Sequence, residues 1–274
     1  MDIFSKKICF IGSGNMTRSI LAGLIKEGMP AQNITVTAPS DHKRKKLKEE
    51  FNVIETNSNR DAILNSEIII LSVKPQMMQL VCEELNDMDL SSKKVISLAA
   101  GIKIQKYELW FNQKLQLIRV MPNTPSLIGQ GVSGMFAPHF IDQSFKKMTE
   151  SLMSSIGKTI WLKNEEQIND IIALSGSSPA YFFLFLQAMQ EFASTLGFEE
   201  KEAKEIVLQA AQGSIALANF ETNKSFKTLR ENVTSKGGTT AAAIENFQQN
   251  NFENIIKESM NAAIKRAIQM ENEF

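Results

Sequence analysis

Cysteine and histidine are scarce in this chain of 274 residues, which contains two of each. The cysteines, Cys9 and Cys82, are too few for a disulfide framework, and their spacing fits no zinc site. The histidines, His42 and His139, do not cluster with other metal-binding residue types. We therefore expect neither structural disulfides nor a bound metal.

An excess of charge is also absent, because 30 lysines and arginines balance 30 aspartates and glutamates. Binding to nucleic acid or to an anionic membrane surface needs a basic excess, so neither is expected as the main partner. The N-terminal segment has no long apolar stretch of the kind found in signal peptides. The longest apolar run, around residues 180–186, is far shorter than the roughly 20 residues of a membrane helix. These absences predict a cytoplasmic protein.

Apolar residues make up 43% of the chain, enough for a sizeable core in one large or two ordinary domains. The first half alternates helical patterns with apolar runs that predict strands at 7–11, 34–38, 67–73, 94–98, 116–120, 132–136 and 159–162. Such alternation predicts a doubly wound, mostly parallel sheet. After Trp161 only helical periodicity remains, at 168–174, 179–196, 201–220, 240–250 and 252–271. We predict an α/β domain over residues 1–163 and an all-α domain over residues 164–274.

A glycine turn follows the first predicted strand, where the chain reads Gly12-Ser13-Gly14-Asn15-Met16-Thr17 and then becomes helical. In a dinucleotide-binding unit the first glycine permits the turn, and the second lets the backbone approach a pyrophosphate at the helix N-terminus. Thr17 replaces the third glycine of that fingerprint, so we expect the helix to pack slightly further out. The pattern favours dinucleotide binding over a plain turn between a strand and a helix.

The end of the second predicted strand bears on which dinucleotide binds. An acidic residue there accepts a hydrogen bond from the ribose of NAD, and this chain has none at that point. Asp41 comes later and is expected to cap the next helix. Ser40 and the positive side chains of residues 43–46 suit a 2′-phosphate and favour NADP. The alternative is that most of these lysines form the solvated face of an amphipathic helix.

Three further strand ends carry residues suited to a ligand, since open α/β sheets bind ligands at the carboxyl ends of their strands. Lys74-Pro75 follows one strand, and Pro75 can open the next helix. Ala99-Ala100-Gly101 follows another, and its small residues leave room for a flat ring or a ribose. Met121–Pro125 has two prolines that fix a loop, in which Asn123 and Thr124 offer polar contacts.

Two features stand out in the helical half. Glu231–Glu245 is mostly small and hydroxylated, with adjacent glycines just before a run of alanines. Free N–H groups where that helix begins can bind a small carboxylate, although an ordinary capped helix has the same pattern. The second feature is the helix at 179–196, which we expect to follow a break at 175–179 and to be capped by Ser177 or Ser178. It is apolar on nearly every side, which predicts dimerisation, or alternatively a central core helix.

Together these segments resemble the pyrroline-5-carboxylate reductase family, whose members reduce a cyclic imino acid to proline. The likeness covers nearly the whole chain in order and spacing, and it is carried by FIGSGNM at 10–16, SVKP at 72–75, AAG at 99–101, RVMPNTP at 119–125, LSGSSPAY at 174–181 and NVTSKGGTT at 232–240. It implies a Rossmann domain, an α-helical dimerisation domain and a preference for NADPH over NADH. It also implies homodimers, which in the family often assemble into rings, and a decamer of five dimers is one expectation.

The resemblance also implies roles for individual residues. It places around the cofactor Gly12, Ser13, Gly14, Asn15, Met16, Ser40, Asn59, Val73, Lys74, Pro75, Ala99, Ala100, Gly101, Asn123 and Pro125. It places around the imino-acid substrate Ser235, Gly237, Gly238, Thr239 and Thr240. Thr240 is the candidate catalytic residue, and no metal is implied. In an assembled dimer the substrate segment is expected to come within hydride reach of the nucleotide.

Two positions depart from the family pattern, Ser178 where Gly is usual and Lys236 where Pro is usual. They leave two alternatives open. One is a related enzyme acting on another cyclic imine or on a β-hydroxyacid, although the latter class uses a lysine where residues 175–181 offer Ser and Pro. The other is a non-catalytic protein that binds NADP(H).

Overall fold

The computed structural model describes residues 3–273. Its contacts divide the chain into two units, Met1–Pro179 with Ala262–Phe274, and Ala180–Asn261. The chain changes unit inside two helices, α8 (Ser178–Thr195) and α12 (Phe252–Glu273). The domain limit expected between residues 163 and 164 marks the end of the strands, and it stays a prediction.

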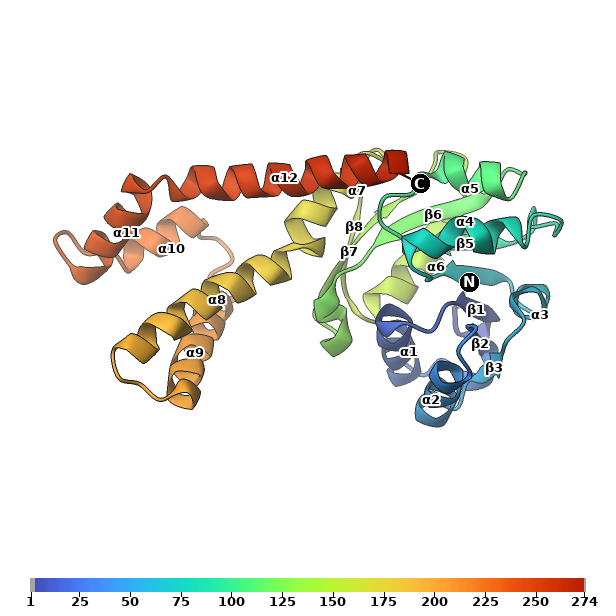
Figure 1. Ribbon diagram of the computed structural model, residues 1–274, viewed down its shortest axis with the longest axis horizontal. Coiled ribbons are helices and arrows are strands. Elements are labelled where there is room, and N and C mark those ends of the chain that lie inside the picture. The colour runs from blue at the N-terminus through green and yellow to red at the C-terminus, as the bar shows by residue number, and fades with distance from the viewer. Residues whose placement is uncertain (1–2, 274) are drawn as a thin grey trace. The chain divides into compact units, whose positions relative to one another are not determined.

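The first unit contains one sheet, formed by β1 (Ile8–Ile11), β2 (Ile34–Thr37), β3 (Ile54–Thr56), β4 (Ile68–Leu71), β5 (Lys94–Ser97), β6 (Gln116–Met121), β7 (Gly131–Phe136) and β8 (Gly157–Trp161). The strand order is β3-β2-β1-β4-β5-β6-β7-β8. Figure 1 shows this sheet and labels all of its strands except β4. Every neighbouring pair is parallel except β6 and β7. The predicted doubly wound, mostly parallel sheet is thus confirmed.

Helices cover both faces of this sheet because its strands bury alternate residues on opposite sides. Ile8 and Phe10 of β1 pack in one core, with side chains of α1 (Asn15–Lys26), α2 (Asp41–Phe51) and α6 (Gln143–Ser154). Cys9 and Ile11 pack in the other core, with α3 (Asn59–Leu64), α4 (Pro75–Glu83) and α5 (Ile104–Trp110). Short 3-10 turns lie at Ile3–Ser5, Ala31–Asn33 and Thr124–Ile128.

The remaining helices are α7 (Gln167–Ile171), α8, α9 (Glu200–Phe220), α10 (Phe226–Asn232), α11 (Thr239–Gln249) and α12. The predicted break between the first two is wrong, because a π-helical turn, Ile172–Gly176, joins α7 to α8. The Ser177 N–H donates to the Ile172 carbonyl at 2.7 Å, which continues the helix by a wider bond. The Ser178 hydroxyl donates to the Ser175 carbonyl at 3.4 Å and caps nothing. Pro179 is tolerated in the first turn of α8, where a missing N–H costs little.

The apolar surface of α8 is exposed in the single chain. Phe182, Phe183 and Phe192 are 64%, 65% and 64% exposed, and no residue of α8 is buried. The alternative of a central core helix within one chain is therefore wrong, and an apolar surface of this kind marks an interaction site. By length and composition, Gln167–Thr195 is also the one helix among residues 3–273 that could cross a bilayer, a test that core helices of soluble proteins pass as well.

Candidate active site

The glycine turn after β1 has the geometry that a dinucleotide requires. Gly12 has φ +119°, and a Cβ there would lie 2.8 Å from the backbone of Ser72, so only glycine fits. A Cβ on Gly14 would meet nothing within 4 Å, which leaves open space at the start of α1. Gly14 is the N-cap residue of α1, and no side chain caps this helix. Open space and free N–H groups at a helix N-terminus fit a pyrophosphate.

Thr17 stands at the position of the missing third glycine, and its buried hydroxyl has two hydrogen-bond partners. Its Oγ1 donates to the Gly12 carbonyl at 3.0 Å and lies 2.9 Å from the hydroxyl of Ser72. The threonine therefore ties α1 to the glycine turn and to the segment after β4. The sequence did not reveal this role of Ser72, and the expected outward shift of α1 stays a prediction.

The end of β2 differs in part from expectation. Ser40, not Asp41, occupies the N-cap position of α2, and it makes no capping hydrogen bond. The Asp41 carboxylate instead binds Lys45 at 2.7 Å and Arg44 at 3.0 Å, and the bond from Lys45 holds the pKa of Asp41 below its usual value. Arg44 is buried and also pairs with Glu55 at 2.8 Å. Two of the four positive side chains at 43–46 are therefore committed to carboxylates.

Asn59, expected beside the cofactor, is held at the same strand end. The Thr37 hydroxyl of β2 donates to the Asn59 side-chain carbonyl. Thr37 itself is fully buried. This bond joins the end of β2 to the first residue of α3, at the edge of the sheet where the glycine turn lies.

The other predicted cofactor segments end neighbouring parallel strands. Lys74 precedes α4, which begins with Pro75, after β4. Gly101, after β5, has φ +71°, and a Cβ there would lie 2.9 Å from the Cβ of Met270 on α12. Because β4 pairs with both β1 and β5, the structure brings the ends of these strands to one edge. Ligands of doubly wound sheets bind outside this edge, where the strand order reverses.

Asn123 lies after β6 and is buried, with its amide engaged inside the first unit. Its Nδ2 donates to the Ser175 carbonyl at 3.0 Å, and its Oδ1 accepts from the Val132 N–H at 2.9 Å. The side chain therefore joins this loop to the π-helical turn and to β7. Pro125 lies in the adjoining 3-10 turn, where the two prolines predicted a fixed loop.

The predicted substrate segment belongs to the second unit. The Gly238 N–H donates to the Ser235 carbonyl at 3.0 Å, and Gly237 has φ +73°, which together close a tight turn. A Cβ on Gly238 would collide with the Ser235 hydroxyl. No side chain caps α11, whose N-cap is Gly238, and Thr240 lies half-buried in its first turn. Hydroxyls and free N–H groups thus gather at one helix start, as a carboxylate site requires.

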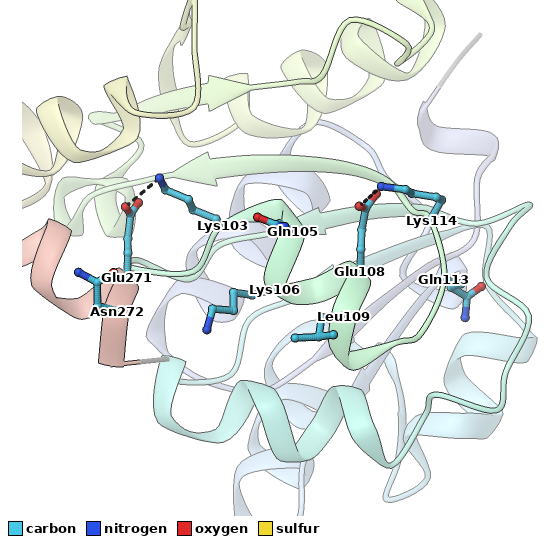
Figure 2. Close-up of a pocket in the computed structure, with 9 residues that line it drawn as sticks. All are labelled: Lys103, Gln105, Lys106, Glu108, Leu109, Gln113, Lys114, Glu271 and Asn272. Carbon is cyan, nitrogen blue, oxygen red and sulfur yellow. Dashed lines mark hydrogen bonds and ion pairs between the residues drawn. The ribbon is translucent and has the colours of Figure 1, made fainter.

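A hollow of about 690 Å³ contains none of the predicted site residues. It lies beside α5 and the end of α12, and Figure 2 shows the residues that line it, among them Lys103, Lys106, Glu108, Lys114 and Glu271. Its rim is mainly long charged side chains. Within residues 3–273 no group of three or more His, Cys, Asp or Glu side chains is placed to hold a metal ion.

Comparisons with known proteins agree with this arrangement. A family model described as pyrroline-5-carboxylate reductase dimerisation matches residues 165–270, and one described as NADP oxidoreductase coenzyme F420-dependent matches residues 7–101. The chain is 46% identical to a pyrroline-5-carboxylate reductase of Vibrio alginolyticus, over 98% of this chain and 99% of the relative.

Two solved structures are similar over almost the full length. A pyrroline-5-carboxylate reductase from Coxiella burnetii has a TM-score of 0.90 and 40% identity, covering 97% of this chain and 98% of that one. A Plasmodium falciparum pyrroline carboxylate reductase with NADP bound has a TM-score of 0.87 and 25% identity, covering 98% and 100%. From the order of its site segments, its sheet topology and these full-length matches, the chain belongs to the pyrroline-5-carboxylate reductase family.

Proposed function

We propose that this chain is an oxidoreductase that reduces the C=N bond of 1-pyrroline-5-carboxylate to give L-proline, with NADPH as reductant. The observation that carries the proposal is the 46% identity with a reductase of that name over 98% of the chain. The reaction is the last step of proline biosynthesis, and it acts on a CH–NH group of the product.

The cofactor, when bound, supplies the hydride. We assign its pyrophosphate to the turn Gly12–Met16 and its adenosine phosphate to the region of Ser40, with Asn59 close by. We assign its nicotinamide half to Val73–Pro75, Ala99–Gly101 and the loop containing Asn123 and Pro125. The open space at Gly14 and the uncapped start of α1 support the first assignment.

The preference for NADPH over NADH is part of the proposal. No acidic side chain ends β2, and Lys43 remains exposed on the first turn of α2. A 2′-phosphate there would meet a positive charge, whereas the strand end itself offers a ribose hydroxyl no carboxylate. The next carboxylate along the chain, that of Asp41, is paired with Arg44 and Lys45. Measurement of kcat/KM with each cofactor tests this, and a higher value with NADH contradicts it.

The substrate site is proposed at the start of α11, where Ser235, Gly237, Gly238 and Thr239 hold the carboxylate and Thr240 contacts the ring nitrogen. A cyclic imine is basic enough to be protonated when it reacts, so no strong side-chain acid is required. Thr240 can hydrogen-bond the nitrogen and relay a proton from water. Its side chain is half-buried in the first turn of α11, at the helix start where the substrate is proposed to bind.

The decisive experiment is a spectrophotometric assay of NADPH oxidation with pyrroline-5-carboxylate. We expect Thr240→Ala to lower kcat by about 100-fold, as loss of a positioned proton donor does. Thr240→Ser, which keeps the hydroxyl, should retain most of the activity. Unchanged turnover in Thr240→Ala contradicts the role of Thr240. Wild-type protein that leaves NADPH unoxidised contradicts the function itself, and favours either another imine or a non-catalytic NADP(H)-binding protein.

We further propose that the chain acts as a cytoplasmic homodimer, and that five dimers can assemble into a decamer. The exposed phenylalanines of α8 and the match of a dimerisation family model to residues 165–270 support the dimer. Light scattering of the purified protein gives the mass directly. A monomer at micromolar concentration contradicts the proposed dimer.

A further inference from the structure

A cluster of buried charged side chains lies beside the loop that follows β5, and the proposed reaction does not use it. Arg119 of β6 is 1% exposed, and its Nη1 donates to Glu165 at 2.9 Å. The same nitrogen lies 3.8 Å from the carboxylate of Glu271, near the end of α12. The Nε and Nη2 atoms of Arg119 have no hydrogen-bond partner within residues 3–273. The two carboxylates are therefore what compensates a buried positive charge.

Glu271 connects this cluster to two more elements of the first unit. Its Oε1 accepts from the Asn169 amide of α7 at 3.1 Å. Its Oε2 lies 3.4 Å from the ammonium of Lys103, and Figure 2 shows these two side chains pointing toward one another. The Glu271 side chain is only 7% exposed, so these contacts are poorly screened by water. Glu271 is thus held by Arg119, Asn169 and Lys103, which belong to β6, to α7 and to the loop after β5.

The end of α12 meets the loop after β5 at two points. Lys103, the partner of Glu271, stands two residues after Gly101. Met270, the neighbour of Glu271, packs so closely on Gly101 that a Cβ there would lie 2.9 Å from the Met270 Cβ. The loop is therefore linked to α12 both by the ion pair of Lys103 with Glu271 and by the packing of Gly101 on Met270.

Hydrogen bonds hold this loop at its flanks. The Ala99 N–H donates to the Ser97 hydroxyl at 3.3 Å, and the Ile104 N–H donates to Glu165 at 2.8 Å. Between these flanks Ala100 and Gly101 form a turn, in which Gly101 has φ +71°. The contact of Gly101 with Met270 places this turn against α12.

We propose that Glu271 is a positioning residue for the cofactor. It holds the end of α12 against Gly101 and Lys103 and so fixes the loop Ala99–Gly101 where the nicotinamide half of NADP(H) binds. The inference rests on the part of the proposed function that assigns this loop to the cofactor. The proposal assigns Glu271 contacts with Lys103, Asn169 and Arg119 only, and no contact with cofactor or substrate.

The test is the affinity for NADPH of Glu271→Gln, followed by the fluorescence of the reduced nicotinamide on binding. Glutamine keeps the size of the side chain and an oxygen for Asn169, but it removes the charge opposite Lys103 and Arg119. We expect the Kd for NADPH to rise about fivefold or more, while KM for the imine changes much less. The matched control is Glu273→Gln, whose carboxylate pairs with the exposed Arg266 and should leave the Kd unchanged.

A second variant keeps the test decisive if Glu271→Gln fails to fold. Lys103→Met removes the other end of the contact from a side chain that is 39% exposed, and it should raise the Kd in the same direction. A folded Glu271→Gln protein with a lower melting temperature but an unchanged Kd overturns the inference, because the residue is then only structural.

Wild-type protein that does not bind NADPH overturns both the inference and the proposed function. Protein that binds NADPH but does not reduce the imine overturns the function alone, and the Kd values still decide the role of Glu271.

Discussion

The Thr17 hydroxyl of α1 lies 2.9 Å from the Ser72 hydroxyl that follows β4, and both oxygens contact the carbonyl of Gly12. The Ser72 hydroxyl also reaches the carbonyl of Ile11, at 3.1 Å. The start of α1 and the segment after β4, 55 residues apart in the sequence, therefore meet at the turn where a pyrophosphate is proposed to bind. In this chain a pair of hydroxyls, of which that of Thr17 is fully buried, joins α1 to the turn where the fingerprint has a third glycine.

Replacement of Thr17 by valine should weaken both the fold and cofactor binding. Valine keeps the shape but leaves the Gly12 carbonyl with one partner fewer, which we expect to cost about 1–2 kcal/mol of unfolding free energy. The altered turn should raise the Kd for NADPH several-fold. The matched control is Thr149→Val on α6, because the Thr149 hydroxyl is equally buried and donates to the Phe145 carbonyl at 3.0 Å. Equal Kd values for the two variants would contradict a role of Thr17 in the site.

The two glycines of the turn should respond differently to alanine. Gly12→Ala forces a Cβ to within 2.8 Å of the Ser72 backbone at a positive φ, and we expect a loss of about 3 kcal/mol or more of stability. Gly14→Ala meets no neighbour, so the protein should stay as stable as the wild type within about 1 kcal/mol. Its methyl group should instead occupy the space of the pyrophosphate and raise the Kd for NADPH. Thermal melts and binding titrations of both variants check this, and a Gly14→Ala protein with wild-type affinity contradicts the proposed pyrophosphate position.

The sheet could be predicted because its strands are continuous apolar runs, the pattern of a parallel sheet buried on both faces. The edge strand β3 could not be predicted, because Ile54–Thr56 has only three residues and is not a continuous apolar run. The six-residue helix α3 escaped notice for a similar reason. The break between α7 and α8 was wrong because Ser, Gly and Pro are usual helix breakers, whereas here a π-helical turn accommodates them.

The parts of the site formed by residues adjacent in the sequence could be predicted, whereas the parts formed by distant residues could not. The glycine turn after β1 is readable because its strand, turn and helix are adjacent in the sequence. The contacts of Glu271 with Arg119 and Lys103 could not be predicted, because these residues are brought together only by the fold of the whole first unit. Nor could the sequence show that Asp41 binds Arg44 and Lys45 instead of capping α2, because carboxylates suit both roles.

Both cysteines should be unreactive until the protein unfolds. Cys9 and Cys82 are free and fully buried, and burial raises the pKa of Cys9 to about 12 and that of Cys82 as well. Since the thiolate is the reactive form, Ellman's reagent should label neither thiol of the native protein at pH 8 and both in guanidinium chloride. Above the usual thiol pKa of about 8.5 the unfolded chain alone loses these protons, so stability should fall as the pH rises further. Rapid labelling of the native protein contradicts this burial.

Lys236→Pro should stabilise the substrate segment. Lys236 is the second residue of the turn closed by Ser235 and Gly238, whose third residue, Gly237, has φ +73°. Proline suits that second position because its ring fixes a suitable φ, and within residues 3–273 the Lys236 N–H donates no hydrogen bond that would be lost. We expect a gain of about 0.4–1 kcal/mol in unfolding free energy, mainly through a less flexible unfolded chain.

Measurements of activity then distinguish the effect of the turn's backbone conformation from the effect of the Lys236 charge. Lys236→Ala removes the ammonium without adding the ring, and because this side chain is exposed and screened we expect kcat/KM for the imine to change by less than about threefold. Lys236→Pro should match or exceed the wild type, since it holds the N–H groups before α11 in the same geometry. A large loss of kcat/KM in both variants, with stability unchanged, would instead show that the ammonium attracts the substrate carboxylate. A Lys236→Pro protein that melts at a lower temperature would mean that the backbone at this position cannot accept a proline.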